Sequence, residues 1–550
     1  MNKKSLVLVS LSLLALSSCG ESPITCDPDF GDCSETINIE MEDDKNTNYV
    51  FDSSSTNLNS SVNYEIFVRS FYDSNNDGIG DFSGVKAKLP YLKELGVKDL
   101  WLMPFNASGS YHGYDVTDYY AVNSDYGTLD DFKSLVNEAK KYNIGIMMDL
   151  VLNHSSKNNP WFSQSYQDKI NNNASSDSKA DWYNWTETGS GDYYKYNNLY
   201  YQGKFDSGMP DFNLSSLSLR EEIKKIVKYW IDLGVSGFRL DAVLYYYYNV
   251  TSANVEFLKW LNDYTKSINE NIEFVGECWS NLSTINDYYK SGVESFFDFS
   301  SSVKGTGNDS IIGVSKGIYN AQRFSAAIEA KEGIRKANNS KGYSSYFLSN
   351  HDMDRVAKNC YGDYAKTCAS TYLLLPGTPY IYYGEEIEMV GERTTSPDDL
   401  SDVKRRLPMI WSEKNKTGQC SFPEKNRTDL DNTTQVRKGV EDMLSANYSL
   451  INHYKKVINV RNKYPFIKNA IYTDLTASLN TTNEHILVYE LSSGDNKIVI
   501  IQNYNKYNIE VDFPFSSKIL DSINTSRKIP TLKDNKLKVG AYSTVILDRI

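Results

Sequence analysis

Four short apolar segments of this 550-residue chain end in side chains that can transfer protons or attack carbon. The polar residues at these four ends are Asn153 and His154; Arg239 and Asp241; Glu277; and His351 and Asp352. Carboxylates and imidazoles are the usual general acids, general bases and nucleophiles of enzymes. One such segment would be weak evidence, because an Asp after a strand is often a helix cap. Four in succession indicate side chains that converge on one catalytic site.

Eight strand-like segments alternate with helical patterns and would position these residues. The predicted strands are residues 64–71, 97–104, 144–152, 237–243, 273–279, 296–299, 346–350 and 379–383. Residues 219–233 illustrate the helices, with apolar residues at helical spacing and Gly234 as the terminating residue. This alternation predicts an α/β fold, a (β/α)8 TIM barrel, over residues 61–463. In such a barrel the strand ends form one mouth, where the active site lies.

Two regions depart from the alternation. Residues 153–211 follow the third strand, show no strong helical period and are rich in Asn, Ser, Asp, Trp and Tyr. A loop of this length is usually functional, so we expect an inserted domain there. From residue 464 the helical pattern gives way to alternating runs such as 485–491 and 497–502. These predict a C-terminal all-β sandwich domain over residues 464–550.

The ordered segments resemble those of a known family. Residues 149–154, Gly237–Asp241, Glu277 and Asn350–Asp352 are similar to motifs of the family 13 glycoside hydrolases, the α-amylase family. Tyr111-His112-Gly113-Tyr114-Asp115 also matches this family, and Met209-Pro210-Asp211-Phe212-Asn213 resembles a bacterial subgroup between oligo-1,6-glucosidases and neopullulanases. The resemblance runs from about residue 64 to the C-terminus.

The resemblance implies three catalytic roles. Asp241 would be the nucleophile, Glu277 the general acid and then the general base, and Asp352 would stabilise the distorted sugar in the transition state. Such a double displacement retains the anomeric configuration and needs two carboxyls about 5 Å apart. Burial and neighbouring carboxylates should raise the pKa of Glu277. Arg239 shares a strand face with Asp241 and would keep it ionised.

The resemblance also implies a set of sugar-binding residues. Tyr114 would stack on the sugar ring, and the hydroxyls would be bound by His112, Asp115, His154 and His351. Residues 153–211 would be the domain B of this family, one wall of the cleft. We interpret the tyrosine run 245–248 as packing residues, because tyrosine is abundant throughout the chain, with 42 copies.

A candidate calcium loop follows the first strand. Its oxygen donors occur at every second position around a glycine turn: Asp73, Asn75, Asp77, Ile79 through its carbonyl, and Asp81. This spacing suits a hard cation such as Ca²⁺. The loop has Gly84 where an EF-hand has its twelfth-position Glu, and a strand precedes it. The related family binds structural calcium at this place, whereas the alternative is a metal-free Asx-rich turn.

The N-terminus is predicted to be a lipoprotein signal over residues 1–19. Lys3 and Lys4 precede a short apolar core, and residues 16–19 end in Cys19, which would be lipidated. The alternative is an ordinary secretory signal. Residues 20–60 are polar and are expected to be a disordered tether. Gly20, rather than Asp, follows the Cys, which favours the cell surface or outer membrane.

The net charge and the cysteine content limit which binding partners and covalent bonds this chain can have. The net charge of −12 argues against nucleic acid, because an acidic chain repels phosphates. Export would permit disulfides, and Cys26 with Cys33 and Cys360 with Cys368 are close enough in sequence to pair. Sequence alone does not prove either pairing. No cysteine spacing matches a zinc site. We expect the protein to be a monomer that binds an α-glucan substrate and a membrane.

Within this family, Ala242 after the nucleophile favours endo-cleavage of α-1,4 bonds, because Val at this position tends to accompany α-1,6 cleavage. Leu244 and Tyr245 occupy the region where many α-amylases have a Lys-His pair, so the sequence is also compatible with neopullulanase-like cleavage. It is compatible, too, with an α-glucosidase or oligo-1,6-glucosidase and, from a different functional class, with a non-catalytic sugar-binding relative.

Overall fold

Eight short parallel strands form the centre of the protein. The computed structural model describes residues 39–44, 60–248, 250–393, 401–421, 438–479 and 481–549. The eight strands are β1 (Asn63–Ile66), β2 (Asp99–Leu102), β5 (Gly145–Leu150), β9 (Gly237–Leu240), β10 (Glu273–Gly276), β11 (Ser295–Phe297), β12 (Tyr343–Ser345) and β13 (Tyr380–Tyr382). Their order in the sheet is β12-β11-β10-β9-β5-β2-β1-β13. The predicted barrel is therefore confirmed.

The two edges of this sheet meet. The backbone N–H of Tyr380 donates to the Tyr346 carbonyl at 2.8 Å, and that of Thr378 donates to the Ser344 carbonyl at 2.9 Å. These bonds close the barrel between β12 and β13. The seventh strand was predicted three residues too late, at 346–350. The apolar run at 346–350 misled the prediction, because β12 itself carries serines. Ser344 can be buried in this strand because its hydroxyl donates to Glu332 at 2.6 Å.

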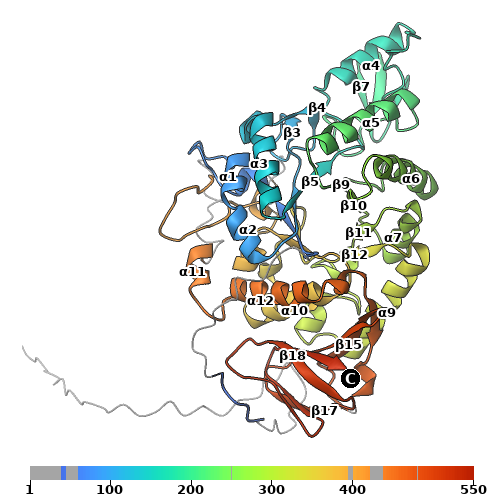
Figure 1. Ribbon diagram of the computed structural model, residues 1–550. Coiled ribbons are helices and arrows are strands. Elements are labelled where there is room, and N and C mark those ends of the chain that lie inside the picture. Colours follow the sequence, from blue (N-terminus) through green and yellow to red (C-terminus); the bar gives the residue numbers. More distant parts are fainter. Residues whose placement is uncertain are drawn as a thin grey trace, which may run out of the picture. The chain divides into compact units, whose positions relative to one another are not determined.

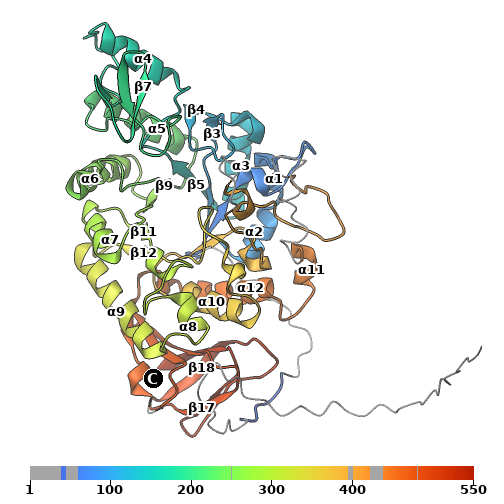
Figure 2. The ribbon, with the colours of Figure 1, turned by 180° about the vertical axis from the view of Figure 1, so that it is seen from behind.

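The helices surround the barrel (Figure 1). They are α1 (Phe82–Ala87), α2 (Leu89–Leu95), α3 (Leu129–Lys141), α5 (Leu217–Asp232), α6 (Thr251–Ile268), α7 (Leu282–Tyr288), α8 (Ile311–Ser315), α9 (Ala321–Asn338), α10 (Asp363–Leu374), α11 (Val440–Leu444) and α12 (Leu450–Lys463). Helix α5 buries Ile223, Val227 and Trp230, as its periodicity predicts. Gly234 follows it with φ +97°. Viewed from behind, α6, α7 and α9 lie outside β9 to β12 in succession (Figure 2).

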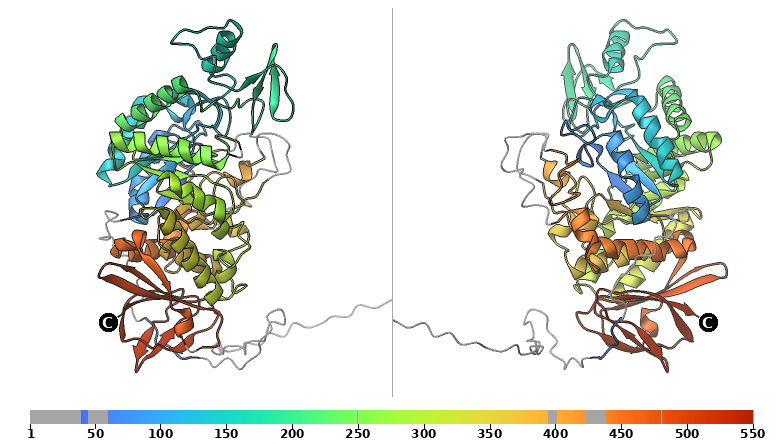
Figure 3. Two further views of the ribbon diagram at one scale, coloured as in Figure 1. Left: turned by 90° about the vertical axis from the view of Figure 1, so that its right-hand side faces the viewer. Right: turned by 60° about the vertical axis from the view of Figure 1, so that its left-hand side comes forward.

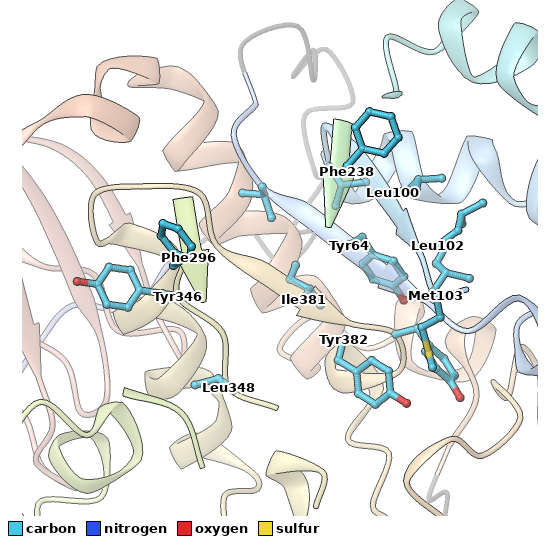
Figure 4. Close-up of a cluster of buried hydrophobic side chains, with 14 of the residues drawn as sticks. Tyr64, Leu100, Leu102, Met103, Phe238, Phe296, Tyr346, Leu348, Ile381 and Tyr382 are labelled. Carbon is cyan, nitrogen blue, oxygen red and sulfur yellow. The ribbon is translucent and has the colours of Figure 1, made fainter. Parts of the chain in front are cut away.

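The apolar strand residues form a continuous core. Tyr64, Leu100, Phe238 and Ile381 come from four different strands and are each fully buried. Figure 4 shows them with neighbouring apolar side chains of this cluster. Burying an apolar side chain of this size contributes about 1.5–3 kcal/mol each. This core fixes the strands, and with them the residues that follow each strand.

The inserted region lies between β5 and α5. It contains α4 (Pro160–Ile170) and a sheet of β6 (Trp185–Thr186), β8 (Leu199–Gln202) and β7 (Tyr193–Tyr196), and it stands out from the barrel (Figure 3). Helix α4 forms in this region although the sequence shows no strong helical period there. Asn159 caps this helix and Pro160 starts it, while Phe162 stacks on Trp185 at 5.1 Å. Aromatic packing, rather than a long apolar stripe, holds it.

The C-terminal domain is all-β, as predicted. One antiparallel sheet has the order β14 (Ile471–Asp474), β15 (Ile486–Ser493), β16 (Asn496–Asn503), β21 (Thr544–Arg549) and β18 (Ser517–Ile523). The other contains β17 (Ile509–Asp512), β20 (Lys536–Val539) and β19 (Thr531–Lys533). Val499 and Leu547 of the first sheet share a buried cluster with Val511 and Leu537 of the second. The two sheets therefore pack as a sandwich.

Part of the predicted tether is ordered. The Ile529 N–H donates to the Glu42 carbonyl at 3.0 Å, and the Asp44 N–H donates to the Arg527 carbonyl at 2.8 Å. The polar composition did not predict this pairing, because the partner residues lie almost 500 positions away. The predicted signal segment with Cys19, and Cys26 and Cys33 of the predicted tether, lie outside the described residues. In the part of the chain that is described, every helix is too short or too polar to cross a bilayer.

Candidate active site

One buried guanidinium joins the carboxylates at the ends of three strands. Arg239 Nη1 lies 2.6 Å from Asp241 Oδ1 and 2.9 Å from Asp149 Oδ1, and Nη2 lies 3.0 Å from Glu277 Oε1. The Arg239 side chain is 1 % exposed. Its planar fork suits several carboxylates at once. Asp241 and Glu277 are thus held side by side, on two nitrogens of a single group.

The backbone is strained at Ala242, directly after Asp241, and this strain positions Glu277. Ala242 has φ +50°, in the left-handed region. Its N–H donates to Glu277 Oε2 at 3.0 Å. Strained backbone of this kind costs about 1–3 kcal/mol and is found at functional sites. Here it turns the chain after Asp241 so that the peptide fixes the second oxygen of Glu277.

Glu277 is set up to hold a proton. Burial raises its pKa, and the charges of Asp241 and Asp352 raise it further, while Arg239 opposes the shift. A glutamic acid side chain that stays protonated at a pH above about 4.3, its ordinary pKa, can act as a general acid. Asp241 Oδ1 makes the shortest of the three carboxylate contacts to Arg239, at 2.6 Å. The arrangement of one carboxyl with a raised pKa beside a second that is tightly paired suits one acid and one nucleophile.

We expect activity to fall as pH rises through the pKa of Glu277. The folded-state pKa is raised, so the proton is retained at lower pH and is lost above that pKa. The measurement is kcat/KM against pH for a maltooligosaccharide and for an α-glucosyl fluoride, whose leaving group needs no proton. The alkaline decline should be strong with the first and weak with the second. An identical decline with both would contradict the acid role.

Asp352 is held from two sides. Its Oδ1 lies 3.0 Å from Arg406 Nη2, and its Oδ2 lies 2.9 Å from His351 Nε2. His351 Nδ1 lies 2.6 Å from Glu65 Oε1 on β1. The charges of Asp352 and Glu65 outweigh burial and raise the pKa of His351 to about 10. Partial desolvation would raise the pKa of Asp352, but the His351 imidazolium and Arg406 hold it well below its usual range. Asp352 is therefore a fixed anion, with 31 % of its side chain exposed.

Tyr114 lies inside this group. Its hydroxyl is 2.7 Å from His351 Nε2 and donates to Asp149 Oδ2 at 3.2 Å. The Tyr114 and His351 rings stack with centroids 5.7 Å apart. Asp149 also accepts from Trp101 Nε1 at 3.2 Å and is fully buried. Tyr114 is thus held by His351 and by Asp149, one of the carboxylates that contact Arg239.

Among the remaining predicted sugar-binding residues, His154 differs from His112 and Asp115. His154 is buried, and its Nε2 has no hydrogen-bond partner among the described residues. Burial lowers the pKa of His154 and the charge of Asp241 opposes this shift, so the two side chains are near each other. His112 accepts from the Tyr114 N–H at 3.1 Å through Nδ1. Asp115 instead accepts from the hydroxyl of Ser108 at 2.6 Å and from that of Ser110. Its contacts are therefore to its own loop.

A row of aromatic rings leads from His154 to the surface. Phe205, in the inserted region, has its ring centroid 5.4 Å from His154 and 5.2 Å from Tyr245. Tyr245 and Tyr248 stack with centroids 6.2 Å apart. Phe205 is 46 % and Tyr248 45 % exposed. The packing interpretation of the tyrosine run holds for buried Tyr246 and is wrong for Tyr248.

Another exposed ring, outside this row, follows Glu277. Trp279 is 43 % exposed and stacks on Phe299 with centroids 4.8 Å apart and planes 13° apart. Exposed aromatic faces of this kind suit the apolar faces of sugar rings. The position of Trp279, two residues after Glu277, could have indicated from the sequence that it lies near the site. Nothing in the sequence around Phe205 indicated this.

The candidate calcium loop is compact. Asp73 accepts backbone N–H groups of Asn76 and Gly78, both at 2.7 Å. Asp77 accepts from the Ile79 N–H at 2.7 Å. Asp81 caps α1 by accepting from the Gly84 N–H at 2.7 Å. Among the described residues, no three or more His, Cys, Asp or Glu side chains are placed to hold a metal.

The fold and the carboxylates at its mouth define a glycoside hydrolase on a (β/α)8 barrel. The family "Alpha amylase, catalytic domain" matches residues 65–470. The chain belongs to this family, the family 13 glycoside hydrolases, and it is an enzyme of that class rather than a non-catalytic relative.

The similar proteins agree with this membership. Alpha-amylase 3 of Dictyoglomus thermophilum is 38 % identical over 495 residues, covering 88 % of this chain and 92 % of the relative. An oligo-1,6-glucosidase of Parageobacillus thermoglucosidasius is 29 % identical, covering 81 % and 90 %. The solved structure of Eubacterium rectale Amy13B has a TM-score of 0.81 and 34 % identity, covering 90 % and 96 %. These relatives match the predicted intermediate subgroup.

Proposed function

We propose that the protein cleaves internal α-1,4 bonds of starch-type α-glucans by double displacement. The observation that supports the chemistry is the Arg239 bridge between Asp241 and Glu277. Asp241 attacks the anomeric carbon while protonated Glu277 donates its proton to the leaving oxygen. Glu277 then removes a proton from the water that hydrolyses the covalent intermediate. Asp352, held by His351 and Arg406, stabilises the positive charge that develops on the sugar.

The aromatic row supports attack within a chain rather than at its end. We infer that this row lies along the path of the leaving chain, because residues 242–248 start at the peptide whose N–H binds Glu277, the proposed acid. The exposed rings of Phe205 and Tyr248 would contact sugars beyond the first leaving sugar, with Tyr245 packed between them. Several leaving-side sugars can then contribute binding energy, which favours internal cuts in a polymer.

The early product pattern on soluble starch tests this specificity. Endo-attack predicts rapid loss of iodine colour with mixed maltooligosaccharides. Glucose as the sole early product, or faster hydrolysis of isomaltose than of maltotetraose, would instead assign the enzyme to the oligo-1,6-glucosidases. Pullulan in a parallel reaction distinguishes neopullulanase-like cleavage. Paired reactions with the Phe205→Ala and Phe466→Ala variants would show whether the row matters, because Phe466 lies between α12 and β14, away from this row.

A structural Ca²⁺ on residues 73–81 is a second part of the proposal. Burial raises the pKa of the Cys420 thiol, and the charges of Asp73, Asp81 and Asp77 raise it further against Arg69, so all three carboxylates lie near this one thiol. Two of the five proposed donors, the Asn75 amide oxygen and the Ile79 carbonyl, carry no charge. The positive φ of Asn76 and Gly78 allows the tight turn. Hard oxygen donors of this kind would hold calcium and fix the loop that leads into α1.

Removal of calcium should destabilise the fold without altering the chemistry. A bound ion stabilises the native state by mass action, so excess chelator should lower the melting temperature and added Ca²⁺ should restore it. Asp77→Asn should weaken this response, whereas Asp130→Asn, on the exposed start of α3, should leave it unchanged. A melting curve insensitive to chelator, with no calcium by elemental analysis, would contradict the site.

Lipid anchoring through Cys19 completes the proposal. The short apolar segment and the Cys support cleavage and lipidation, and several acyl chains would hold the protein at the cell surface or outer membrane. We expect Cys19→Ala to release the enzyme or leave its precursor unprocessed, with Cys26→Ala as the matched control. Unchanged processing and membrane fractionation of Cys19→Ala would show that the anchor is wrong.

A further inference from the structure

Two buried cysteines meet next to the segment that presents Asp352. Cys360 Sγ and Cys368 Sγ are 2.9 Å apart, and both residues are fully buried. The sulfurs would need to approach by only about 0.9 Å to reach the ~2.05 Å of a disulfide bond. The other described cysteines lie elsewhere: Cys278 follows Glu277, and Cys420 lies beside the acidic loop.

The local fold brings this pair together. The Cys360 N–H donates to the Val356 carbonyl at 2.9 Å at the end of a short helical turn. Gly362 then reverses the chain with φ +62°, and α10 begins at Asp363. This reversal lays Cys360 against the second turn of α10, where Cys368 faces the core. The sulfur contact therefore results from an ordered turn in the backbone.

We propose that Cys360 and Cys368 form an intramolecular disulfide in the mature enzyme. Both thiols lose their hydrogens and one S–S bond forms, while a disulfide oxidant such as oxidised glutathione accepts two electrons and two protons and leaves as two thiols. The proposal depends on the proposed export only for the supply of this oxidant.

The bond would hold the segment that carries Asp352. The other end of this segment is already fixed, because Asp354 pairs with Arg405 at 2.7 Å. The disulfide would fasten the far end to α10 and so limit opening of residues 352–360. A covalent cross-link stabilises mainly by restricting the unfolded chain. The expected consequence is greater heat resistance with little change in turnover at moderate temperature.

Peptide mapping of the intact enzyme tests the bond. The protein is incubated with oxidised glutathione, alkylated under denaturing, non-reducing conditions and digested with trypsin, which cleaves after Lys358, Lys366 and Arg393. We expect residues 359–366 linked to residues 367–393, lighter than the two free peptides by two hydrogen atoms. Alkylated Cys360 and Cys368, or either one carrying glutathione, would overturn the proposal.

The stabilising role is tested separately from catalysis. Reductant should lower the melting temperature of the oxidised enzyme by a few degrees, and this shift should be absent in Cys360→Ser, Cys368→Ser and the double variant. Cys420→Ser is the control and should keep the shift. A reductant effect that persists in Cys360→Ser would show that another bond causes it. Loss of starch hydrolysis in all proteins, with the linked peptide present, would count against the proposed function alone.

Discussion

Asp241→Asn should reduce hydrolysis of maltooligosaccharides by about 10⁴-fold or more, because no covalent intermediate can form without the nucleophile. Asn is nearly isosteric with Asp, and the neighbouring Arg239 keeps two other carboxylate partners, Asp149 and Glu277. The variant should therefore fold. Steady-state kinetics and a melting curve measure the two effects.

Glu277→Gln should show a different pattern. Its hydrolysis of maltooligosaccharides should fall by a comparable factor, but an α-glucosyl fluoride should still form the intermediate, because fluoride leaves without a proton. Asp99→Asn is a matched control. Asp99 is a buried carboxylate at the start of β2, the opposite end of that strand from the site, and accepts from Ser236. Near-normal turnover by folded Asp241→Asn would contradict the assignment.

Arg239→Lys should lower kcat by about 10²–10³-fold, because removal of one preorganised electrostatic group costs that much. A lysine keeps the charge but cannot contact Asp241 and Glu277 through two separate nitrogens. Arg239→Met should in addition lower the free energy of unfolding by about 3–5 kcal/mol, since buried carboxylates lose their counter-charge. Kinetics and denaturant unfolding measure the two effects.

Arg335→Lys separates structural from catalytic loss. Arg335 is as deeply buried as Arg239 and pairs with Glu332 within α9. Its replacement should destabilise the protein and leave the kinetics of the folded enzyme unchanged. If Arg239→Lys lost stability but kept kcat and the pH profile, Arg239 would be a structural residue only.

The sequence predicted the parts of the site that follow strands. Asp241 and Glu277 were found because each ends an apolar run, and the barrel geometry brings such ends together. Glu65 was not found as a partner of His351, because it lies within the first strand, 286 positions away. Arg406 was also missed, since nothing in its local sequence points to Asp352. Contacts of such long range depend on the closed barrel.

The fold prediction failed where tertiary contacts override local pattern. The seventh strand carries two buried serines, of which Ser344 donates to Glu332 and Ser345 bonds to the Ser295 hydroxyl, so its sequence lacks the apolar signal of a strand. Helix α4 depends on aromatic partners from the inserted sheet. Phe205 lies in the same polar insertion, and only the fold places it against His154.

Covalent trapping tests the central claim most directly. A fluorinated α-glucosyl fluoride that forms the intermediate quickly and releases it slowly should label one residue of the enzyme. Double displacement predicts that mass spectrometry of the digest finds the sugar on Asp241, and that the first product of maltooligosaccharide hydrolysis is the α-anomer. A label on another residue, or a β-anomer as the first product, would contradict the double displacement by Asp241 and Glu277.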